Sequence, residues 1–151
     1  MPVSTLTAED TLTLYDRVIV DLADDDVSSL SFNNDLVAVK TGKNKNSIYA
    51  KNEMGNNATL TIRLIRGSSD DQFMNSKLVE MQKDFVATSL ATGEFVKRLG
   101  DGQGNVIRDV YTMQGGTFTR RVDSKENVSG DTEQAVAIYT MVFANVIRSH
   151  Q

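Results

Sequence analysis

Acidic side chains are the first place to look for chemistry in this chain. Three adjacent aspartates, Asp24, Asp25 and Asp26, supply carboxylate oxygens of the kind that hard cations prefer. Calcium loops, however, space their oxygen ligands around a glycine and end with a distal bidentate glutamate, and no such frame follows this run. Because runs of like charge are usually solvated, we interpret the three aspartates as an exposed turn rather than a metal site.

The remaining titratable residues form no recognisable catalytic set. The chain has no cysteine, which removes disulfides, thiolate metal sites and cysteine nucleophiles. Its single histidine, His150, stands next to the last residue, where chain ends fray and a general base is hard to hold. We expect that the protein is not an enzyme and that it carries no cofactor.

A glycine-rich stretch at 100–105, GDGQGN, has a superficial likeness to a phosphate-binding loop. The lysine that such loops use is missing, and no helical pattern follows. We predict a hairpin tip between strands at 95–99 and 106–113 instead.

The elements that would position any site are strands and one helix. Alternating polar and apolar residues at 59–64 predict a strand, which ends at Gly67. Ser69 and Gln72 then have the spacing of a helix N-cap and its partner. Apolar residues at helical spacing predict a helix over about residues 69–85; they are Met74, Leu78, Met81 and Phe85.

Further strands are predicted from β-branched and apolar runs at 14–22, 27–32, 35–40, 117–122 and 132–148. In the first of these, Val18 and Val20 are assigned to one face and Ile19 to the other. The core of the 35–40 strand is assigned to Leu36 and to Val37 through Val39.

Two pairs of residues are predicted to form turns between strands. Asn33 and Asn34 suit a turn with positive φ, and Gly115 and Gly116 mark another.

The last predicted strand is apolar on both faces. Such a strand is either central in a sandwich or barrel, or has one side covered by a neighbouring subunit.

Length and charge exclude several classes of protein. A chain of 151 residues is one ordinary domain. A net charge of −4 argues against a protein that binds mainly to nucleic acid phosphates. No apolar run approaches about 18 residues and the first residues are polar and acidic, so we expect neither a membrane span nor a secretory signal.

Residues 41–57 form a long polar loop rich in lysine, asparagine and glycine. The loop is either a mobile excursion or an arm that becomes ordered against another chain, and its lysines favour an acidic surface on a like subunit. We predict inter-subunit contacts in this loop and on the last strand. The candidate residues are Lys43, Lys45, Ile48, Tyr49, Lys51, Met54, Tyr139, Met141 and Phe143.

Two segments carry a resemblance to a known family: TLTIRLIRGSSDDQFMNSKL at 59–78 and GGTFTRRVDSKENVSGDTEQAVAIYTMVFAN at 115–145. The first is a strand that enters a capped helix after a long polar loop. The second is a turn and short strand, a polar passage, and a long apolar strand. The chain resembles, over about residues 18–148, the tail tube (inner tube) proteins of contractile-tailed bacteriophages, related to pyocin and type VI secretion tube proteins.

The resemblance implies a mainly β fold, a β-sandwich or barrel of antiparallel strands with one flanking α-helix. The implied organisation is a single tail-tube-like domain, 1–151, with an N-terminal arm (1–13) and the long polar loop (41–57). The implied function is that of a structural virion protein. Its copies would self-assemble into hexameric rings, which stack into the hollow tail tube that conducts DNA into the host cell.

The resemblance also implies partners and a location. The partners are further copies of the chain, the tail sheath protein, the baseplate hub, the tail terminator and the tape-measure protein, while DNA passes without sequence-specific binding. The location is the virion tail, after assembly in the host cytoplasm.

Two alternatives stay open. A tube of a phage-derived bacteriocin or a type VI-like secretion system would share the fold and lack the genome. A monomeric ligand-binding β-domain would keep the mass of one subunit and have a concave apolar pocket.

Overall fold

The computed structural model describes residues 4–23, 28–52, 55–124, 126, 128 and 132–151. Among them α1 (Ser69–Lys83) is the one α-helix, and a short 3-10 helix, η1 (Thr132–Ala135), precedes the last strand. The strands in chain order are β1 (Thr5–Leu14), β2 (Arg17–Ile19), β3 (Ser28–Phe32), β4 (Val37–Thr41), β5 (Ser47–Lys51), β6 (Ala58–Ile65), β7 (Ala91–Gly100), β8 (Val106–Phe118) and β9 (Val136–His150). No helix in the described ranges is long and apolar enough to cross a membrane.

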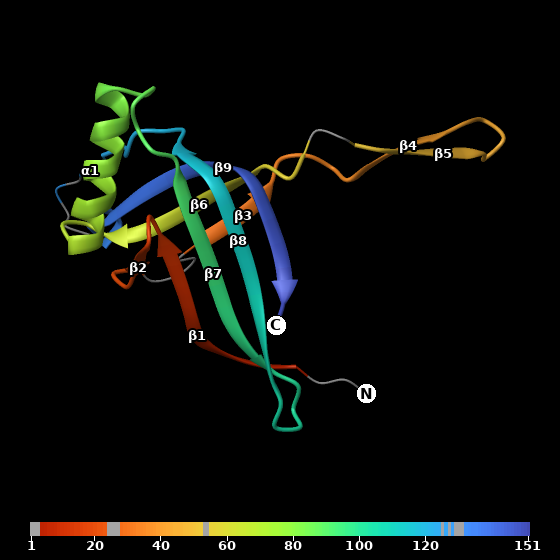
Figure 1. The fold of residues 1–151 in the computed structure, drawn as a ribbon, viewed down its shortest axis with the longest axis horizontal. Helices are drawn as coiled ribbons and strands as arrows, with labels where there is room; N and C mark the ends of the chain where they lie inside the picture. Colours follow the sequence, from red (N-terminus) through yellow and green to blue (C-terminus); the bar gives the residue numbers. More distant parts are fainter. Residues whose placement is uncertain (1–3, 24–27, 53–54, 125, 127, 129–131) are drawn as a thin grey trace.

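Seven strands form one antiparallel sheet in the order β2-β1-β7-β8-β9-β6-β3, and the sheet is strongly curved (Figure 1). Although three strands separate β1 from β6 in this order, Leu14 and Leu64 are buried in the same hydrophobic cluster. The sheet therefore curls until the inner faces of distant strands meet. The predicted fold class, mainly β with antiparallel strands and a single flanking helix, is confirmed. The ladder itself stays open, because β2 and β3 do not pair with each other.

The chain crosses between the two ends of the curled sheet directly after β2. In this crossing segment (residues 21–23), the Ala23 amide donates to the Arg63 carbonyl and the Ile65 amide donates to the Asp21 carbonyl, both over 2.9 Å. Leu22 adds an isolated antiparallel bridge to Leu64. Since β2 pairs with β1 and the crossing segment pairs with β6, one short stretch of chain ties the two ends together.

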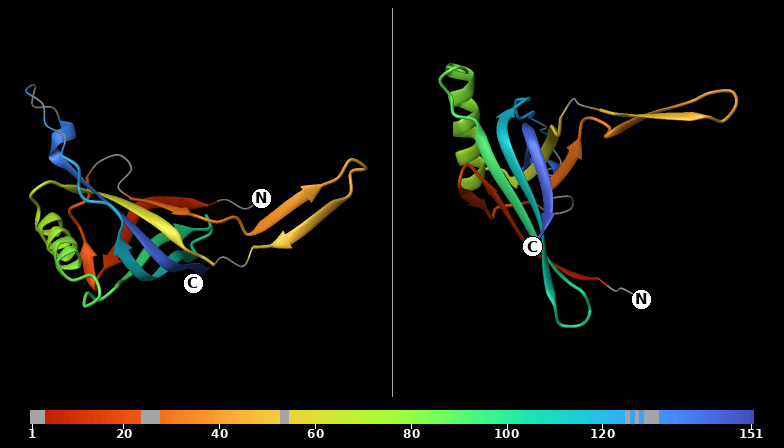
Figure 2. Two further views of the ribbon diagram at one scale, coloured as in Figure 1. Left: turned by 90° about the horizontal axis from the view of Figure 1, so that it is seen from above. Right: turned by 45° about the vertical axis from the view of Figure 1, so that its right-hand side comes forward.

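Helix α1 packs at one end of the curled sheet (Figures 1 and 2). Met74 and Leu78 are buried, and Met81 packs against the same core, so this part of the predicted stripe is confirmed. The N-cap is Ser68 and not Ser69, because the Ser68 hydroxyl accepts the Asp71 amide.

The helix ends earlier than the predicted range of about 69–85. It stops at Lys83, and Phe85 is 61% exposed. The Asp84 amide donates to the Glu80 carbonyl over 3.2 Å, and the Thr88 hydroxyl donates to the Asp84 carbonyl over 2.7 Å, which satisfies an oxygen that the helix leaves unpaired.

The strand predicted over 14–22 is instead the junction of two strands. Tyr15 and Asp16 have φ values of 51° and 61°, and Leu14 pairs with Arg17 across a two-residue turn. Ile19 lies directly opposite Leu12 and therefore shares its buried face. Val18 and Val20 are both exposed, so they lie on the side away from the buried Ile19, in agreement with their predicted assignment to different faces.

The two predicted strands around Asn33 and Asn34 do not form a hairpin. β3 pairs with β6, and β4 pairs with β5 in a separate sheet, so the segment Leu36–Val39 lies outside the core. Neither asparagine has a positive φ. Asn34 Nδ2 donates to Asn57 Oδ1 over 2.5 Å, so this residue fixes the base of the β4–β5 hairpin instead.

The N-terminal part of the described chain contributes a strand to the sheet. Residues 5–14 of the chain form β1, which lies between β2 and β7, and Leu12 and Leu14 are in the core.

The predicted hairpin tip at Gly100–Asn105 is confirmed, because Gly100 pairs with Val106 across it.

Gly115 and Gly116 lie inside a continuous strand, so the predicted turn at this position is wrong. Gly115 has φ 68°, and the register between β7 and β8 shifts opposite this point, as at a β-bulge. Gly116 lies directly opposite Phe143 on β9, and a Cβ at Gly116 would overlap the buried Phe143 ring. The glycine is therefore required by packing against an aromatic ring.

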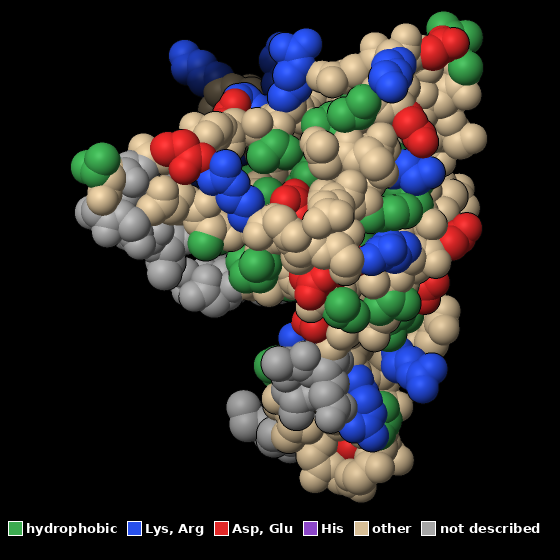
Figure 3. Space-filling view, turned by 90° about the vertical axis from the view of Figure 1, so that its left-hand side faces the viewer, with side chains coloured by type: hydrophobic (Ala, Val, Ile, Leu, Met, Phe, Trp, Pro, Cys, Tyr) green, Lys and Arg blue, Asp and Glu red, His purple; other side chains and the backbone are tan. Residues whose placement is uncertain are grey.

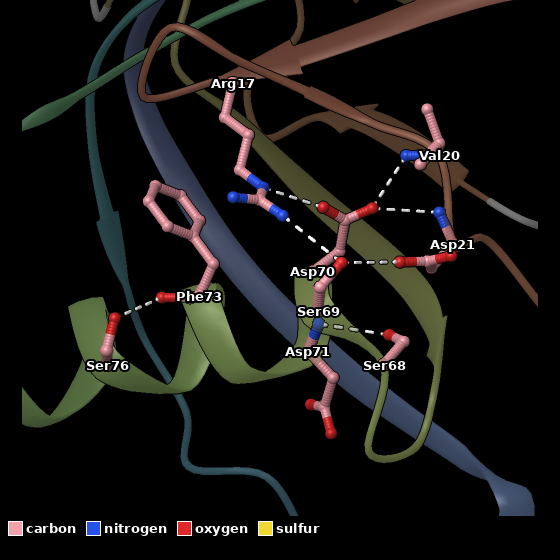
Figure 4. Close-up of polar contacts among 9 residues, drawn as sticks. All are labelled: Arg17, Val20, Asp21, Ser68, Ser69, Asp70, Asp71, Phe73 and Ser76. Atoms are coloured by element: carbon pink, nitrogen blue, oxygen red, sulfur yellow. Dashed lines mark hydrogen bonds and ion pairs between the residues drawn. The ribbon is translucent and has the colours of Figure 1, made fainter.

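Asp70 connects the helix to the crossing segment (Figure 4). Its side chain has no exposed surface, and its carboxylate accepts Arg17 Nε at 2.8 Å, the Val20 amide at 2.7 Å and the Asp21 amide at 2.9 Å. Burial acts to raise the pKa of Asp70, but the hydrogen bonds from Arg17 and the two amides outweigh it and lower the pKa below 3.8.

Asp71 makes the matching connection to the sheet. Tyr139 Oη donates to Asp71 Oδ1 over 2.6 Å, and the Gly67 amide donates to Asp71 Oδ2 over 2.8 Å. Burial and this carboxylate raise the pKa of Tyr139. Two adjacent acids in the first turn of α1 thus bind two separate parts of the fold.

Gly116→Ala should destabilise the fold, because a methyl group would displace the buried Phe143 ring. We expect a loss of about 1–3 kcal/mol in the free energy of unfolding, measured by urea denaturation with circular dichroism. Gly42→Ala is the control, because the nearest atom to its added Cβ is the Asn46 carbonyl oxygen at 3.8 Å. Equal effects of the two substitutions would contradict this packing.

Asp70→Asn should lower the free energy of unfolding by roughly 2–3 kcal/mol near neutral pH. The NH2 group of the asparagine side chain cannot accept the hydrogen bonds that a carboxylate oxygen accepts. The lowered pKa means that this contribution is complete above the ordinary carboxyl pKa and is lost as the pH falls through the folded-state value. The stability difference between the two proteins should therefore shrink as the pH falls below about 4. Urea titrations across that range measure it.

Asp123→Asn is the matched control for Asp70→Asn. Its ion pair with Arg120 is exposed on both sides, so we expect a change below about 0.5 kcal/mol. A difference between wild type and Asp70→Asn that stays constant on acidification would refute the role of the ionised carboxylate.

Candidate assembly surfaces

A two-stranded hairpin, β4–β5, projects away from the body of the molecule on the side opposite α1 (Figures 1 and 2). Its register pairs Val39 with Tyr49 and Thr41 with Ser47, and a turn with Lys45 at φ 65° closes the tip. The predicted polar loop is therefore mostly an ordered hairpin. The sequence does not predict that residues 37–41 and 47–51 pair with each other. The few apolar residues of β5 stand among many lysines, asparagines and glycines, so no clear strand pattern is seen there.

Every residue of β4 and β5 is exposed. Ile48 is 71% exposed and Tyr49 72%, although both are large apolar side chains. Tyr49 shares one face with Val39, while Ile48 lies opposite Lys40 on the other face. An isolated two-stranded hairpin is marginally stable in water, and exposed apolar side chains on both faces are typical of a segment that is buried on association.

The predicted contact residues of the loop lie together on this hairpin. Lys43 and Lys45 are at its turn, and Lys51 is on β5 opposite Val37. Met54 lies outside the described residues. The hairpin thus combines apolar side chains with four lysines, Lys40, Lys43, Lys45 and Lys51, on a narrow support.

The predicted contact residues of the last strand lie elsewhere. Tyr139, Met141 and Phe143 are buried in the core of this chain, facing β6 and β8 on either side. The hypothesis that they contact another subunit is corrected, because the curled sheet and α1 already cover their face. The strand is central, which was one of the two interpretations of its double apolar pattern.

Other exposed apolar side chains were missed by sequence reasoning. Ile138 and Ile147 are exposed on β9, and Phe85, Val86 and Leu90 are exposed after α1. The face that carries α1 shows hydrophobic patches among charged side chains of both signs (Figure 3). For the residues after α1, the sequence signal was the adjacent apolar pair Phe85 and Val86 near the end of the helix.

Charged clusters elsewhere are paired within the chain. Arg148 binds Asp109 through two hydrogen bonds of 2.8 and 2.9 Å, and His150 Nε2 lies 3.6 Å from the same carboxylate. The hydrogen bond from Arg148 outweighs burial and lowers the pKa of Asp109. In the part of the chain that the structure describes, no three acidic or histidine side chains gather as a metal site would require.

No protein-family model and no curated protein matches the sequence. Solved structures do share the fold. A chain of the PVC sheath–tube complex, from an extracellular contractile injection system in its extended state, matches with a TM-score of 0.63 at 12% identity, covering 96% of this chain and 91% of that chain. A chain of the tube-terminating cap of the anti-feeding prophage matches with a TM-score of 0.61 at 12% identity, covering 96% and 90%.

A chain of the PVC sheath/tube terminator in the extended state matches with a TM-score of 0.55 at 14% identity, covering 94% of each chain. At such identities the likeness is one of fold, and it extends over nearly the whole length of both partners. The chain has the fold found in these contractile injection particles, and the predicted resemblance to tail tube proteins is confirmed at that level.

Proposed function

We propose that this chain is a structural tube protein of a contractile injection particle, whose copies form rings that stack into a hollow tube. The observation that carries the proposal is the fold shared over 96% of the chain with a chain of a sheath–tube complex. That neighbour and the terminator and cap chains come from assemblies, and none is described as an enzyme.

The projecting hairpin supports assembly on physical grounds. The hairpin exposes three large apolar side chains to water, those of Val39, Ile48 and Tyr49. Burial of each such side chain against a partner would contribute about 1.5–3 kcal/mol of favourable free energy. The hairpin lies far from its own core, so a second copy is the surface that it can reach (Figure 2). A contact between different surfaces of identical chains closes a ring or extends a filament.

The open sheet offers a second kind of contact. In the described residues, β3 pairs with β6 along one side only and stands at an edge of the sheet. Unpaired edges promote association between chains, which is a liability in a monomer and a joint in a ring. We propose six copies in each ring, as the family resemblance implies.

The proposed partners follow from the resemblance to tail tube proteins. They are further copies of the chain, a sheath around the tube, a terminator, a baseplate hub and a tape-measure protein, in the tail of a particle assembled in the host cytoplasm. In a phage tail the tube would conduct DNA, and an acidic subunit of net charge −4 would repel phosphates rather than bind them. A bacteriocin or secretion tube would use the same subunit without a genome.

A second candidate function is a tube terminator or cap. It is favoured by the TM-scores of 0.61 and 0.55 to chains from a cap and a terminator, which are close to that of the sheath–tube chain. A terminator would form single rings and would not stack.

A monomeric ligand-binding domain is the remaining alternative. It predicts a concave apolar pocket, whereas the cleft beside the start of α1 is lined by Arg63, Arg66, Arg120 and Arg121. Its sedimentation coefficient would not depend on protein concentration.

Purified protein at high concentration should form rings of uniform diameter and hollow rods in negative-stain electron microscopy. Class averages should show six-fold symmetry. Single rings that never stack would favour the terminator, and a monomer at all concentrations and salt conditions would refute the proposal.

The double substitution Val39→Ser and Tyr49→Ser should prevent tube formation while leaving the subunit folded, because both side chains lie on one exposed face of the hairpin. Assembly should shift to at least about tenfold higher protein concentration, as expected for the loss of roughly 1.4 kcal/mol per contact. Sedimentation velocity measures the shift. Val20→Ser, which removes an exposed valine far from the hairpin, is the control.

Tubes of unchanged length from the double variant would show that the hairpin is not a joint. Loss of the native circular dichroism spectrum would instead show that the hairpin stabilises the subunit, which its isolation from the core argues against.

A further inference from the structure

A cleft of about 820 Å³ lies between the start of α1, the beginning of β9 and the segment that follows β8. Asp71 and Asn75 of the helix form one wall, and Ala137 and Ile138 of β9 contribute apolar surface. Helix α1 and the beginning of β9, which line the cleft, lie on the side of the molecule away from the β4–β5 hairpin (Figure 1).

Four arginines line this cleft, which we call the arginine cleft: Arg63 and Arg66 from β6 and its end, and Arg120 and Arg121 after β8. The whole chain has eight arginines and a net charge of −4. Half of the guanidinium groups of an acidic protein are therefore gathered at one place, and such gathering creates a local positive potential.

The chain itself neutralises only part of this charge in the described residues. Arg66 pairs with Glu126, and Arg120 pairs with Asp123 at 3.3 Å, but these pairs are exposed on both sides and can be exchanged for other partners. No described carboxylate pairs with Arg63 or Arg121, and Arg63 Nε is buried without a hydrogen-bond acceptor. A buried donor without an acceptor is uncommon in folded proteins, and no described group fixes the Arg63 guanidinium by a hydrogen bond at this nitrogen.

Guanidinium groups recognise carboxylates, like phosphates, by geometry. Their planar donors match the two oxygens of a carboxylate and form paired, charge-assisted hydrogen bonds. The apolar surface of Ala137 and Ile138 next to the arginines suits aliphatic side chains between the acids. This combination fits a peptide better than an isolated anion.

Two other occupants fit less well. A nucleic acid strand would bring an unbroken row of phosphates against Asp71 and Asp123, which also line the cleft. The hairpin of a second copy carries lysines, and like charges would repel it from the arginines.

We propose that the arginine cleft binds an acidic peptide segment of a partner protein, with Arg63 and Arg121 as the principal carboxylate ligands. This interaction surface is separate from the hairpin and does not depend on ring or tube formation. Charge-assisted binding of this kind weakens as the salt concentration rises.

Fluorescence anisotropy with a labelled peptide of alternating glutamate and valine tests the proposal on the full chain. Arg63→Gln with Arg121→Gln should weaken binding by about tenfold or more, since two charge-assisted pairs are lost. Arg98→Gln with Arg108→Gln is the matched control, because these two arginines face each other on β7 and β8 outside the cleft and the change in net charge is the same. The control should change the affinity less than about twofold.

Arg63→Lys with Arg121→Lys should bind with intermediate affinity, because lysine keeps the charge and loses the paired geometry. If Arg63→Gln disturbs folding by circular dichroism, Arg121→Gln alone should still weaken binding about threefold, since Arg121 is exposed and makes no described structural contact. Equal losses in the cleft and control variants would overturn the proposal, as would no peptide binding at about 1 mM or tighter binding of a single-stranded oligonucleotide.

Discussion

The buried carboxylate of Asp70 is the interaction on which the arrangement of the fold depends. A sheet that curls without closing its ladder needs another device to hold its two ends together. The crossing segment supplies the link, and Asp70 fixes that segment through the amides of Val20 and Asp21 while pairing with Arg17. Three donors satisfy the carboxylate in a site without water access, so the charge stabilises one geometry and penalises others.

The body of the molecule and its projecting hairpin differ strongly in burial. The leucines of β6 and the aromatic side chains of β9 are completely covered by the chain's own strands and helix. The hairpin has no such cover and exposes Ile48 and Tyr49. A rigid body with a projecting, partly apolar arm is the form expected of a subunit whose remaining burial occurs on assembly, and chains of similar fold occur in sheath–tube, cap and terminator structures.

The basic side chains also differ between the two sides of the subunit. Four of the eight lysines lie on the β4–β5 hairpin, and four of the eight arginines line the cleft beside the start of α1. The hairpin and α1 are on opposite sides of the molecule (Figure 1). Lysine at exposed positions favours adaptable, long-range attraction, whereas arginine beside an apolar wall favours paired, geometric recognition. The two surfaces are therefore suited to different partners on opposite sides of one subunit.

The sequence by itself determined the elements whose pattern is local. The alternation of Leu60, Ile62 and Leu64 and the helical spacing of Met74 and Leu78 record burial directly, and the hairpin residues Ile48 and Tyr49 were identified as contact candidates from their polar setting. Only the tertiary structure decided which strands pair, and hence which faces are buried. Ile19 faces inward because it lies opposite Leu12, and Tyr139 is in the core because it lies opposite Ile62 on β6 and its ring packs against Phe118. Periodicity records the polarity of side chains along one strand, but pairing between distant strands depends on the path of the whole chain.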